Sequence, residues 1–195
     1  MKLFLLPYLD HPLHSIAEVK LLADNVPTNP GHEIYLQDWM GELQFTPITL
    51  WRVGKVGKCI DPKFMARYLD RATIGVSFMA AESSEEIPEQ MKFGFDDSIV
   101  RSDLWWNADE SDWDSLKIRV VEKEECIEEQ EANRMVFPDA HIIVESLAYI
   151  SQYYLLKIGD LVAFPLWKAY RPIKANQGIF ITDQRDEEVL YCGIK

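Results

Sequence analysis

Residues 156–162 read Leu-Lys-Ile-Gly-Asp-Leu-Val, and they join two contrasting parts of the chain. Before them, apolar side chains recur at helical spacing behind the start signal Pro138-Asp139. Gly159 and Asp160 then favour a tight turn. Residues 161–166 follow as a short apolar run that is typical of a strand. The sequence therefore predicts a helix, a turn and a buried strand in direct succession.

Outward from this stretch, the pattern predicts more strands than helices. A second helix is expected to start with Asp61 as the N-cap and Pro62 at its first position, and to run to residue 72. A weaker helical pattern covers residues 14–22. Strands are expected where β-branched and aromatic residues concentrate, at residues 45–53, 73–79, 116–121, 161–166, 178–182 and 188–192.

These elements do not alternate strictly along the chain. They favour a mainly β, α+β fold over a doubly wound parallel sheet. The length of 195 residues suits one domain, residues 1–195, in which residues 1–42 form the segment with the weakest pattern.

The charge balance is strongly acidic, with a net charge of −12 at pH 7. Residues 122–131 form the longest charge run, which is acidic, and no comparable cluster of Lys and Arg exists. Proteins that bind nucleic acid or anionic membranes usually present a basic surface, so we expect neither partner. The acidic run is interpreted as a solubility feature, and the sequence shows no further role for it.

The cysteines Cys59, Cys126 and Cys192 lie far apart and are odd in number. Their spacing favours reduced thiols over a zinc site or a redox pair. No apolar run approaches the 18 residues of a membrane span, and the N-terminal apolar run is too short for a signal peptide. We therefore expect a cytoplasmic protein.

Four segments resemble, in the same order, segments of the fumarylacetoacetate hydrolase family. They are the Gly-Lys-Val-Gly-Lys turn at 54–58 with its helix and the Thr-Ile-Gly of 73–75, Phe-Asp-Asp-Ser at 95–98, residues 135–162, and the closing hairpin at 178–193. The resemblance implies a mixed β-sheet roll with two or three short helices and a homodimer. It also implies chemistry in which Mg²⁺ or Mn²⁺ binds an oxo-acid that is hydrolysed at a carbon–carbon bond or decarboxylated.

The resemblance places the metal ligands of the family, a Glu-x-Glu pair and an Asp, at Thr46, Ile48 and Ser77. None of these residues is a carboxylate, and residues 43–58 contain no acidic residue at all. A hard dication needs charged oxygen ligands. The nearest alternative, Glu42, would lie about 20 Å from Ile48 along an extended strand. No cofactor is therefore predicted, unless a relocated site holds Mg²⁺ or Mn²⁺.

Other motif positions also differ. At the position where the family has a motif lysine, this chain has Phe93, next to Lys92. The positions of the family's Thr-Gly-Thr-Pro loop are residues 164–167 in this chain. Lys92, Phe93, Phe164 and Trp167 are therefore the residues expected around any pocket. At the N-terminus, residues 8–11 resemble the Asn-Tyr-x-x-His motif, with His14 where the family has Glu. His11 and His14 are candidate catalytic residues because a histidine pair can relay a proton near neutral pH.

Two functional hypotheses follow, and a third remains open. The first is a fumarylacetoacetate hydrolase-like protein with a degraded metal site, which is non-catalytic and binds a small oxo-acid-like ligand or a partner chain. The alternative is an active hydrolase or decarboxylase of acylpyruvates or oxaloacetate that uses a relocated metal or the histidine pair. The third is an unrelated β-rich interaction module. The sequence names no ligand and no pathway.

Overall fold

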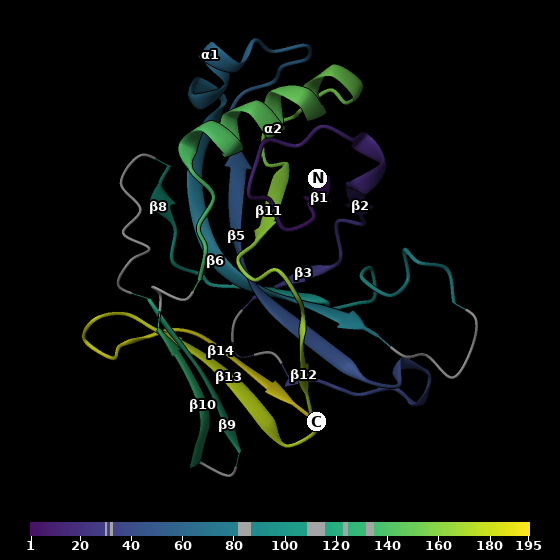
Figure 1. The fold of residues 1–195 in the computed structure, drawn as a ribbon, viewed down its shortest axis with the longest axis vertical. Helices are drawn as coiled ribbons and strands as arrows, with labels where there is room; N and C mark the ends of the chain where they lie inside the picture. The colour runs from purple at the N-terminus through teal and green to yellow at the C-terminus, as the bar shows by residue number, and fades with distance from the viewer. Residues whose placement is uncertain (30, 32, 82–86, 109–115, 123–124, 132–134) are drawn as a thin grey trace.

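The computed structural model describes residues 1–29, 31, 33–81, 87–108, 116–122, 125–131 and 135–195, with only the backbone described at 125–131. Its described part consists of two β-sheets and two α-helices, with short 3-10 turns between them (Figure 1). The predicted mainly β, α+β fold is confirmed. Among the described residues, no helix is long and apolar enough to cross a membrane.

The larger sheet is built on two long neighbouring strands, β5 and β6. Its hydrogen-bonded order is β2-β1-β11-β5-β6-β7-β3, and two short strands, β12 and β8, pair with β5 and β6 respectively. The strands span Leu3–Leu5 (β1), Lys20–Leu22 (β2), Pro27–Thr28 (β3), Leu43–Val53 (β5), Leu69–Ala80 (β6), Ile99–Arg101 (β7), Trp106–Asn107 (β8), Leu161–Pro165 (β11) and Arg171–Ile173 (β12).

The smaller sheet has the order β10-β9-β13-β14-β4. Its strands span Glu33–Ile34 (β4), Lys117–Glu122 (β9), Glu125–Glu131 (β10), Gln177–Thr182 (β13) and Glu188–Ile194 (β14). The sequence pattern missed β10 because its residues carry the acidic run. Pairing with β9 forms this strand in spite of a composition that is poor in β-branched residues.

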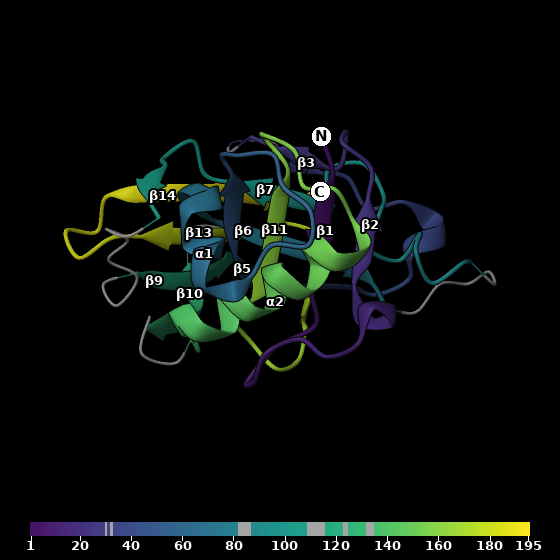
Figure 2. The same cartoon turned by 90° about the horizontal axis from the view of Figure 1, so that it is seen from above.

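Helix α2, Ala140–Tyr153, covers one end of the larger sheet, and the smaller sheet covers the other end (Figures 1 and 2). Three buried clusters result. The helix cluster lies under α2 and includes Phe4, Trp51, Leu147 and Phe164. The sheet cluster lies between the two sheets and includes Phe45, Phe78, Trp167 and Ile179. The N-terminal cluster lies on the opposite face of β5 and β6 and includes Leu3, Ile48, Phe93 and Ile99.

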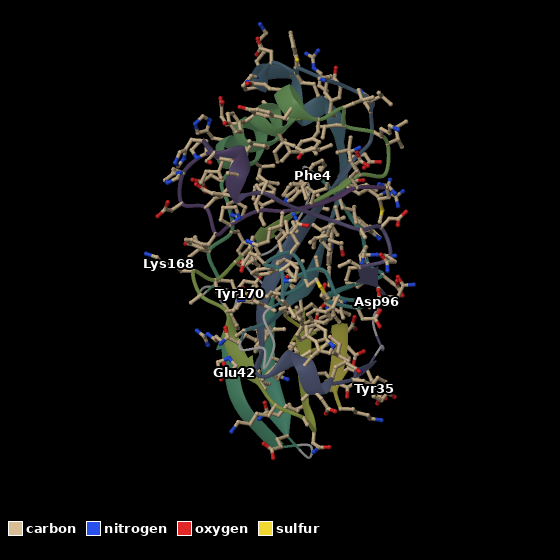
Figure 3. All side chains as sticks on the ribbon, turned by 90° about the vertical axis from the view of Figure 1, so that its right-hand side faces the viewer. Phe4, Tyr35, Glu42, Asp96, Lys168 and Tyr170 are labelled. Atoms are coloured by element: carbon tan, nitrogen blue, oxygen red, sulfur yellow. The ribbon has the colours of Figure 1, made fainter. Side chains whose placement is uncertain are left out.

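The strand pleat explains this division. Phe4 belongs to the helix cluster, whereas its neighbours Leu3 and Leu5 belong to the N-terminal cluster. Side chains of successive strand residues point to opposite faces, so a single strand such as β1 contributes to two clusters. Figure 3 shows Phe4 below the helical end, where it faces α2.

The predicted helix from Asp61 to residue 72 is too long. The side chain of Asp61 does cap it, accepting a hydrogen bond from the Lys63 N–H at 3.1 Å, but α1 spans only Pro62–Met65 and a 3-10 turn follows at Ala66–Tyr68. Strand β6 begins at Leu69 because pairing with β5 extends to that residue. Tertiary pairing overrides the local helical pattern here.

The helical pattern at residues 14–22 is also wrong. The chain forms one 3-10 turn at Ile16–Glu18 and then strand β2, which pairs with β1. By contrast, α2 begins where predicted, after Asp139, and buries four members of the predicted stripe, Ile142, Ile143, Leu147 and Ile150. The fifth, Tyr154, is the C-cap of the helix and is half-buried. Gly159 adopts φ +86°, the left-handed conformation that glycine tolerates best.

The turn after Gly159 is held by a buried carboxylate. Asp160 is 1% exposed, and its two oxygens accept hydrogen bonds from the backbone N–H groups of Lys2 and Lys157, both at 2.8 Å. The Lys2 ammonium lies 2.6 Å from the same carboxylate. Asp160 therefore joins β1 to the start of β11, which pair in parallel.

We predict that Asp160→Ala lowers the free energy of unfolding by about 3 kcal/mol, because it leaves two partly buried N–H groups without their acceptor and Lys2 without its partner. Urea denaturation measures the change. The matched control is Asp24→Ala, at an exposed aspartate 3.9 Å from the N-terminal ammonium, where a loss below about 0.5 kcal/mol is expected. Equal effects at the two positions would contradict the structural role of Asp160.

Candidate functional site

The three positions that the resemblance assigns to metal ligands lie together in the structure. Thr46 on β5 stands directly opposite Ser77 on β6, and Ile48 stands opposite Gly75. Because side chains two residues apart share a face of a strand, Thr46, Ile48 and Ser77 point to the same side of the sheet. All three side chains are fully buried, at 0% exposure, so a substrate could not reach them without rearrangement.

This side of the sheet is apolar. Ile48 belongs to the N-terminal cluster, which also contains Leu50, Phe93 and Ile99. The hydroxyls of Thr46 and Ser77 are neutral and weak donors of electron density to a hard dication. Among the residues that the structure describes, no group of three or more His, Cys, Asp or Glu side chains is arranged to hold a metal ion.

A tyrosine fills the space beside Ser77. The Ser77 Oγ lies 3.1 Å from the Tyr170 hydroxyl, and the Tyr170 ring packs edge-on against Phe93 with 5.8 Å between ring centres. Burial raises the pKa of Tyr170 to about 12, while the hydrogen bond with Ser77 acts in the opposite direction. The pair is therefore a neutral hydrogen bond within an apolar surrounding.

Tyr170 reaches this position because of an irregular segment between β11 and β12. Strand β11 ends with Pro165 opposite Ile48, and β12 begins with Arg171 opposite Phe45. Five residues, 166–170, thus lie opposite only two residues of β5, 46 and 47. They cannot all pair with β5, so this segment bulges out of the sheet. This excursion sends Trp167 to one face of the sheet and Tyr170 to the other.

The four residues expected around a pocket do not lie around one cavity. Phe93 is buried in the N-terminal cluster, whereas Phe164 lies in the helix cluster and Trp167 in the sheet cluster, both across the sheet. The Lys92 ammonium lies 3.7 Å from Glu89. The cation nearest to Phe93 is instead Lys20, whose Nζ stands 4.2 Å from the ring centre.

His11 and His14 are close to each other but not to the metal-ligand positions. Their ring centres are 5.0 Å apart, and both side chains are exposed. Leu13 between them is buried in the helix cluster, and its N–H donates to the Ser146 hydroxyl of α2 at 2.9 Å. The pair therefore lies on the α2 side of the sheet, across from Thr46 and Ser77.

Glu42, the acid considered for a relocated metal site, precedes β5 and is exposed. Its carboxylate accepts a hydrogen bond from the Gln44 side chain at 2.6 Å. In Figure 3 it lies below Tyr170, toward the smaller sheet. Tyr170, which lies beside Ser77, and Lys20, which lies over Phe93, were not found from the sequence. Neither matches a motif, and both reach the site through contacts between distant parts of the chain.

No protein-family model and no curated protein sequence matches the chain. Solved structures do match it in three dimensions. The 5-carboxymethyl-2-hydroxymuconate delta-isomerase from Mycobacterium smegmatis superposes with a TM-score of 0.73 at 15% identity, covering 99% of this chain and 78% of that one. A Yersinia pestis CO92 protein assigned to the fumarylacetoacetate hydrolase family gives 0.71 at 15% identity, covering 100% and 92%.

The fumarylpyruvate hydrolase from Pseudomonas aeruginosa, solved in complex with Mn²⁺ and pyruvate, gives a TM-score of 0.71 at 14% identity and covers 100% of this chain and 89% of that one. At such identities the likeness establishes the fold. The chain therefore has the fold of fumarylacetoacetate hydrolase structures over nearly its whole length, as its motifs indicated.

We predict that Tyr170→Phe lowers the free energy of unfolding by about 1 kcal/mol at pH 8, because Ser77 loses its partner. The pKa of Tyr170 in the folded protein, about 12, lies above the ordinary value near 10. The stabilisation of the folded state by the neutral Tyr170 hydroxyl is therefore fully present below pH 10 and is lost as the pH rises toward 12. The difference in stability between wild type and variant should shrink between pH 9 and 11 in urea titrations.

The control for this experiment is Tyr35→Phe, at a tyrosine that is 59% exposed. Its stability difference from wild type should be small at every pH. If the Tyr170→Phe difference instead stayed constant from pH 9 to 11, the buried hydroxyl would have no such linkage to folding.

Proposed function

We propose that this chain is a member of the fumarylacetoacetate hydrolase family that no longer binds a catalytic metal ion and works as a non-catalytic binding protein. One observation carries the proposal: Thr46, Ile48 and Ser77 are buried, neutral and packed among apolar side chains. The fold alone does not support it, because a fold of this kind hosts enzymes and non-enzymes alike.

The energetic argument concerns desolvation. A dication leaving water must exchange strongly bound water for anionic oxygens, and an uncompensated ion in an apolar interior is very costly. Ile48 offers no donor atom, and the Ser77 hydroxyl is already engaged by Tyr170. Phe93 and Tyr170 occupy the space in front of these residues. Binding of a metal–substrate complex would require both aromatic side chains to move.

We predict that the protein shows no saturable Mn²⁺ binding in isothermal titration calorimetry at neutral pH, since the candidate site has no carboxylate. The Pseudomonas aeruginosa fumarylpyruvate hydrolase, which was crystallised with Mn²⁺, is the positive control under the same conditions. Tight binding of one Mn²⁺ per chain would overturn the proposal.

The alternative function is an active hydrolase or decarboxylase of oxo-acids. It is favoured by the side-by-side rings of His11 and His14. Turnover of oxaloacetate or an acylpyruvate by the purified protein would establish it. Loss of that turnover in the double variant His11→Ala and His14→Ala, with an unchanged melting temperature, would assign the chemistry to the pair. Under the proposal above, wild type and double variant are equally inactive.

We further propose that the protein forms a homodimer, which the resemblance also implies. Large apolar side chains are exposed at the end of the molecule near α1 and the C-terminus of α2: Val56 (56%), Phe64 (41%), Leu155 (43%) and Ile158 (68%). Paired backbone hydrogen bonds between Gly57 and Leu156 bring the two segments that carry them together. Exposed apolar side chains gathered in one region are typical of an interaction surface.

The expected result is a dimer mass in multi-angle light scattering at micromolar concentration. Replacing an exposed apolar contact by a charge should weaken the association, so Ile158→Asp is expected to shift the mass toward the monomer. Met91→Asp, at a methionine that is 50% exposed in a different part of the chain, is the matched control. A wild-type monomer would refute the dimer, and an unchanged Ile158→Asp dimer would refute this surface.

A further inference from the structure

An open cavity of about 500 Å³ lies beside β4, which is the edge strand of the smaller sheet. This volume is within the range of small-molecule sites. The 3-10 turn Asp38–Met40 and the turn at residues 95–98 supply the other walls. The charged lining residues are all carboxylates, and three aromatic residues stand with them: Glu33, Asp96, Asp97, Tyr35, Trp39 and Phe95.

The three carboxylates differ in what the protein provides for them. Glu33 is paired with Lys195, whose ammonium lies 2.6 Å away. Asp96 accepts a hydrogen bond from the Asn25 amide at 2.7 Å. Asp97 is half-buried, yet its carboxylate forms no ion pair or hydrogen bond with any residue that the structure describes. The charge of Asp97 is therefore the one that a ligand could balance.

The charge of Asp97 also acts on the protein interior. Burial raises the pKa of the Cys192 thiol to about 12, and the negative charge of Asp97 adds to this increase. Cys192 is fully buried in the sheet cluster. Water thus screens this side of the carboxylate poorly, and a cation placed in the cavity interacts with Asp97 more strongly than it would with a fully solvated acid.

The aromatic walls suit an organic cation. Trp39 and Phe95 are half-buried and pack edge to face with 6.1 Å between ring centres, and Tyr35 is 59% exposed. All three rings therefore keep surface that a ligand can reach. The faces of aromatic rings attract cations, and their apolar surface binds the body of an organic ion. Among the described residues, by contrast, the carboxylates of this cavity are not grouped so that they could hold a metal ion.

We propose that this cavity binds a small organic ammonium ion with an apolar body. The Asp97 carboxylate accepts hydrogen bonds from the ammonium group, and charge-assisted hydrogen bonds of this kind are strong. Asp96 adds negative charge at the same turn. Trp39 and Phe95 contact the apolar body of the ligand.

The cavity is separate from the metal-ligand positions. Neither Thr46, Ile48 nor Ser77 lines it. Phe95 packs against the sheet cluster, whereas Ile48 belongs to the N-terminal cluster on the opposite face of the larger sheet. In Figure 3 Tyr35 and Asp96 lie on one side of the molecule, and Tyr170 lies toward the other. The proposal therefore goes beyond the function proposed above and does not depend on it.

The test uses 2-phenylethylammonium as the probe and the neutral 2-phenylethanol as its matched analogue. In the full chain labelled with ¹⁵N, the indole N–H signal of Trp39 is assigned from its disappearance in Trp39→Phe. The ammonium ion should shift this signal in a saturable manner, and the alcohol should not.

The variant Asp97→Asn should weaken binding of the ammonium ion about tenfold, because it removes the charged acceptor. Asn also tolerates the left-handed backbone of this residue, φ +62°, so the turn is expected to persist. The matched control is Asp10→Asn, which removes the same charge at an exposed aspartate outside the cavity. It should leave the affinity unchanged.

Three results would each overturn the proposal: a Trp39 signal that does not respond to the ammonium ion at millimolar concentration, equal binding of 2-phenylethanol, or equal affinities in Asp97→Asn and Asp10→Asn. An unchanged melting temperature verifies that Asp97→Asn is folded. The comparison of ammonium ion with alcohol needs only the wild type, so it tests the proposal even where a variant is destabilised. No metal ion takes part, and the outcome is independent of the Mn²⁺ titration.

Discussion

The antiparallel pairing of β5 with β6 is the constraint on which the rest of the molecule depends. Its register sets Thr46 opposite Ser77, and the pleat assigns each following residue to one face or the other. One face receives α2 and the smaller sheet, and the other carries the N-terminal cluster. If β5 shifted by one residue relative to β6, each of its side chains would point to the opposite face of the sheet. The buried clusters therefore fix the register as firmly as the hydrogen bonds do.

The irregular segment between β11 and β12, residues 166–170, determines which side chains cover the middle of the larger sheet on each face. Because five residues face only two on β5, the segment cannot continue the ladder and must project its side chains to both faces. Tyr170 closes the metal-ligand positions on one face, and Trp167 packs against Phe45 on the other. Lys168, at the apex between them, is left exposed. A single local irregularity therefore fills the space beside Ser77 on one face and places Trp167 in the sheet cluster on the other.

The sequence predicted the elements whose local signals agree with their tertiary surroundings. Helix α2 has a start signal, an apolar stripe and a terminal glycine, and all three agree with its position over the sheet. The predicted extension of α1 to residue 72 failed because β5 recruits the residues after Tyr68 into a strand. At the candidate site, the motif register grouped Thr46, Ile48 and Ser77, and the structure places these three residues on one face of the sheet. The motif comparison could not find Tyr170. This residue lies in the irregular segment between β11 and β12, where no periodic pattern indicates which way a side chain points.

Asp160 shows what a buried carboxylate needs in this fold. Asp160 accepts two backbone hydrogen bonds and pairs with Lys2, so its buried charge is compensated by the protein itself. Carboxylates at positions 46, 48 and 77 would be fully buried, and like charges at adjacent buried positions repel. Without a cation they would be a large cost, and small or apolar replacements remove it. Ile48, Phe93 and Tyr170 then fill the space that would otherwise be a destabilising cavity. Under the proposed loss of the metal, the neutral residues at these positions and the apolar side chains beside them fit the same frame of β5 and β6.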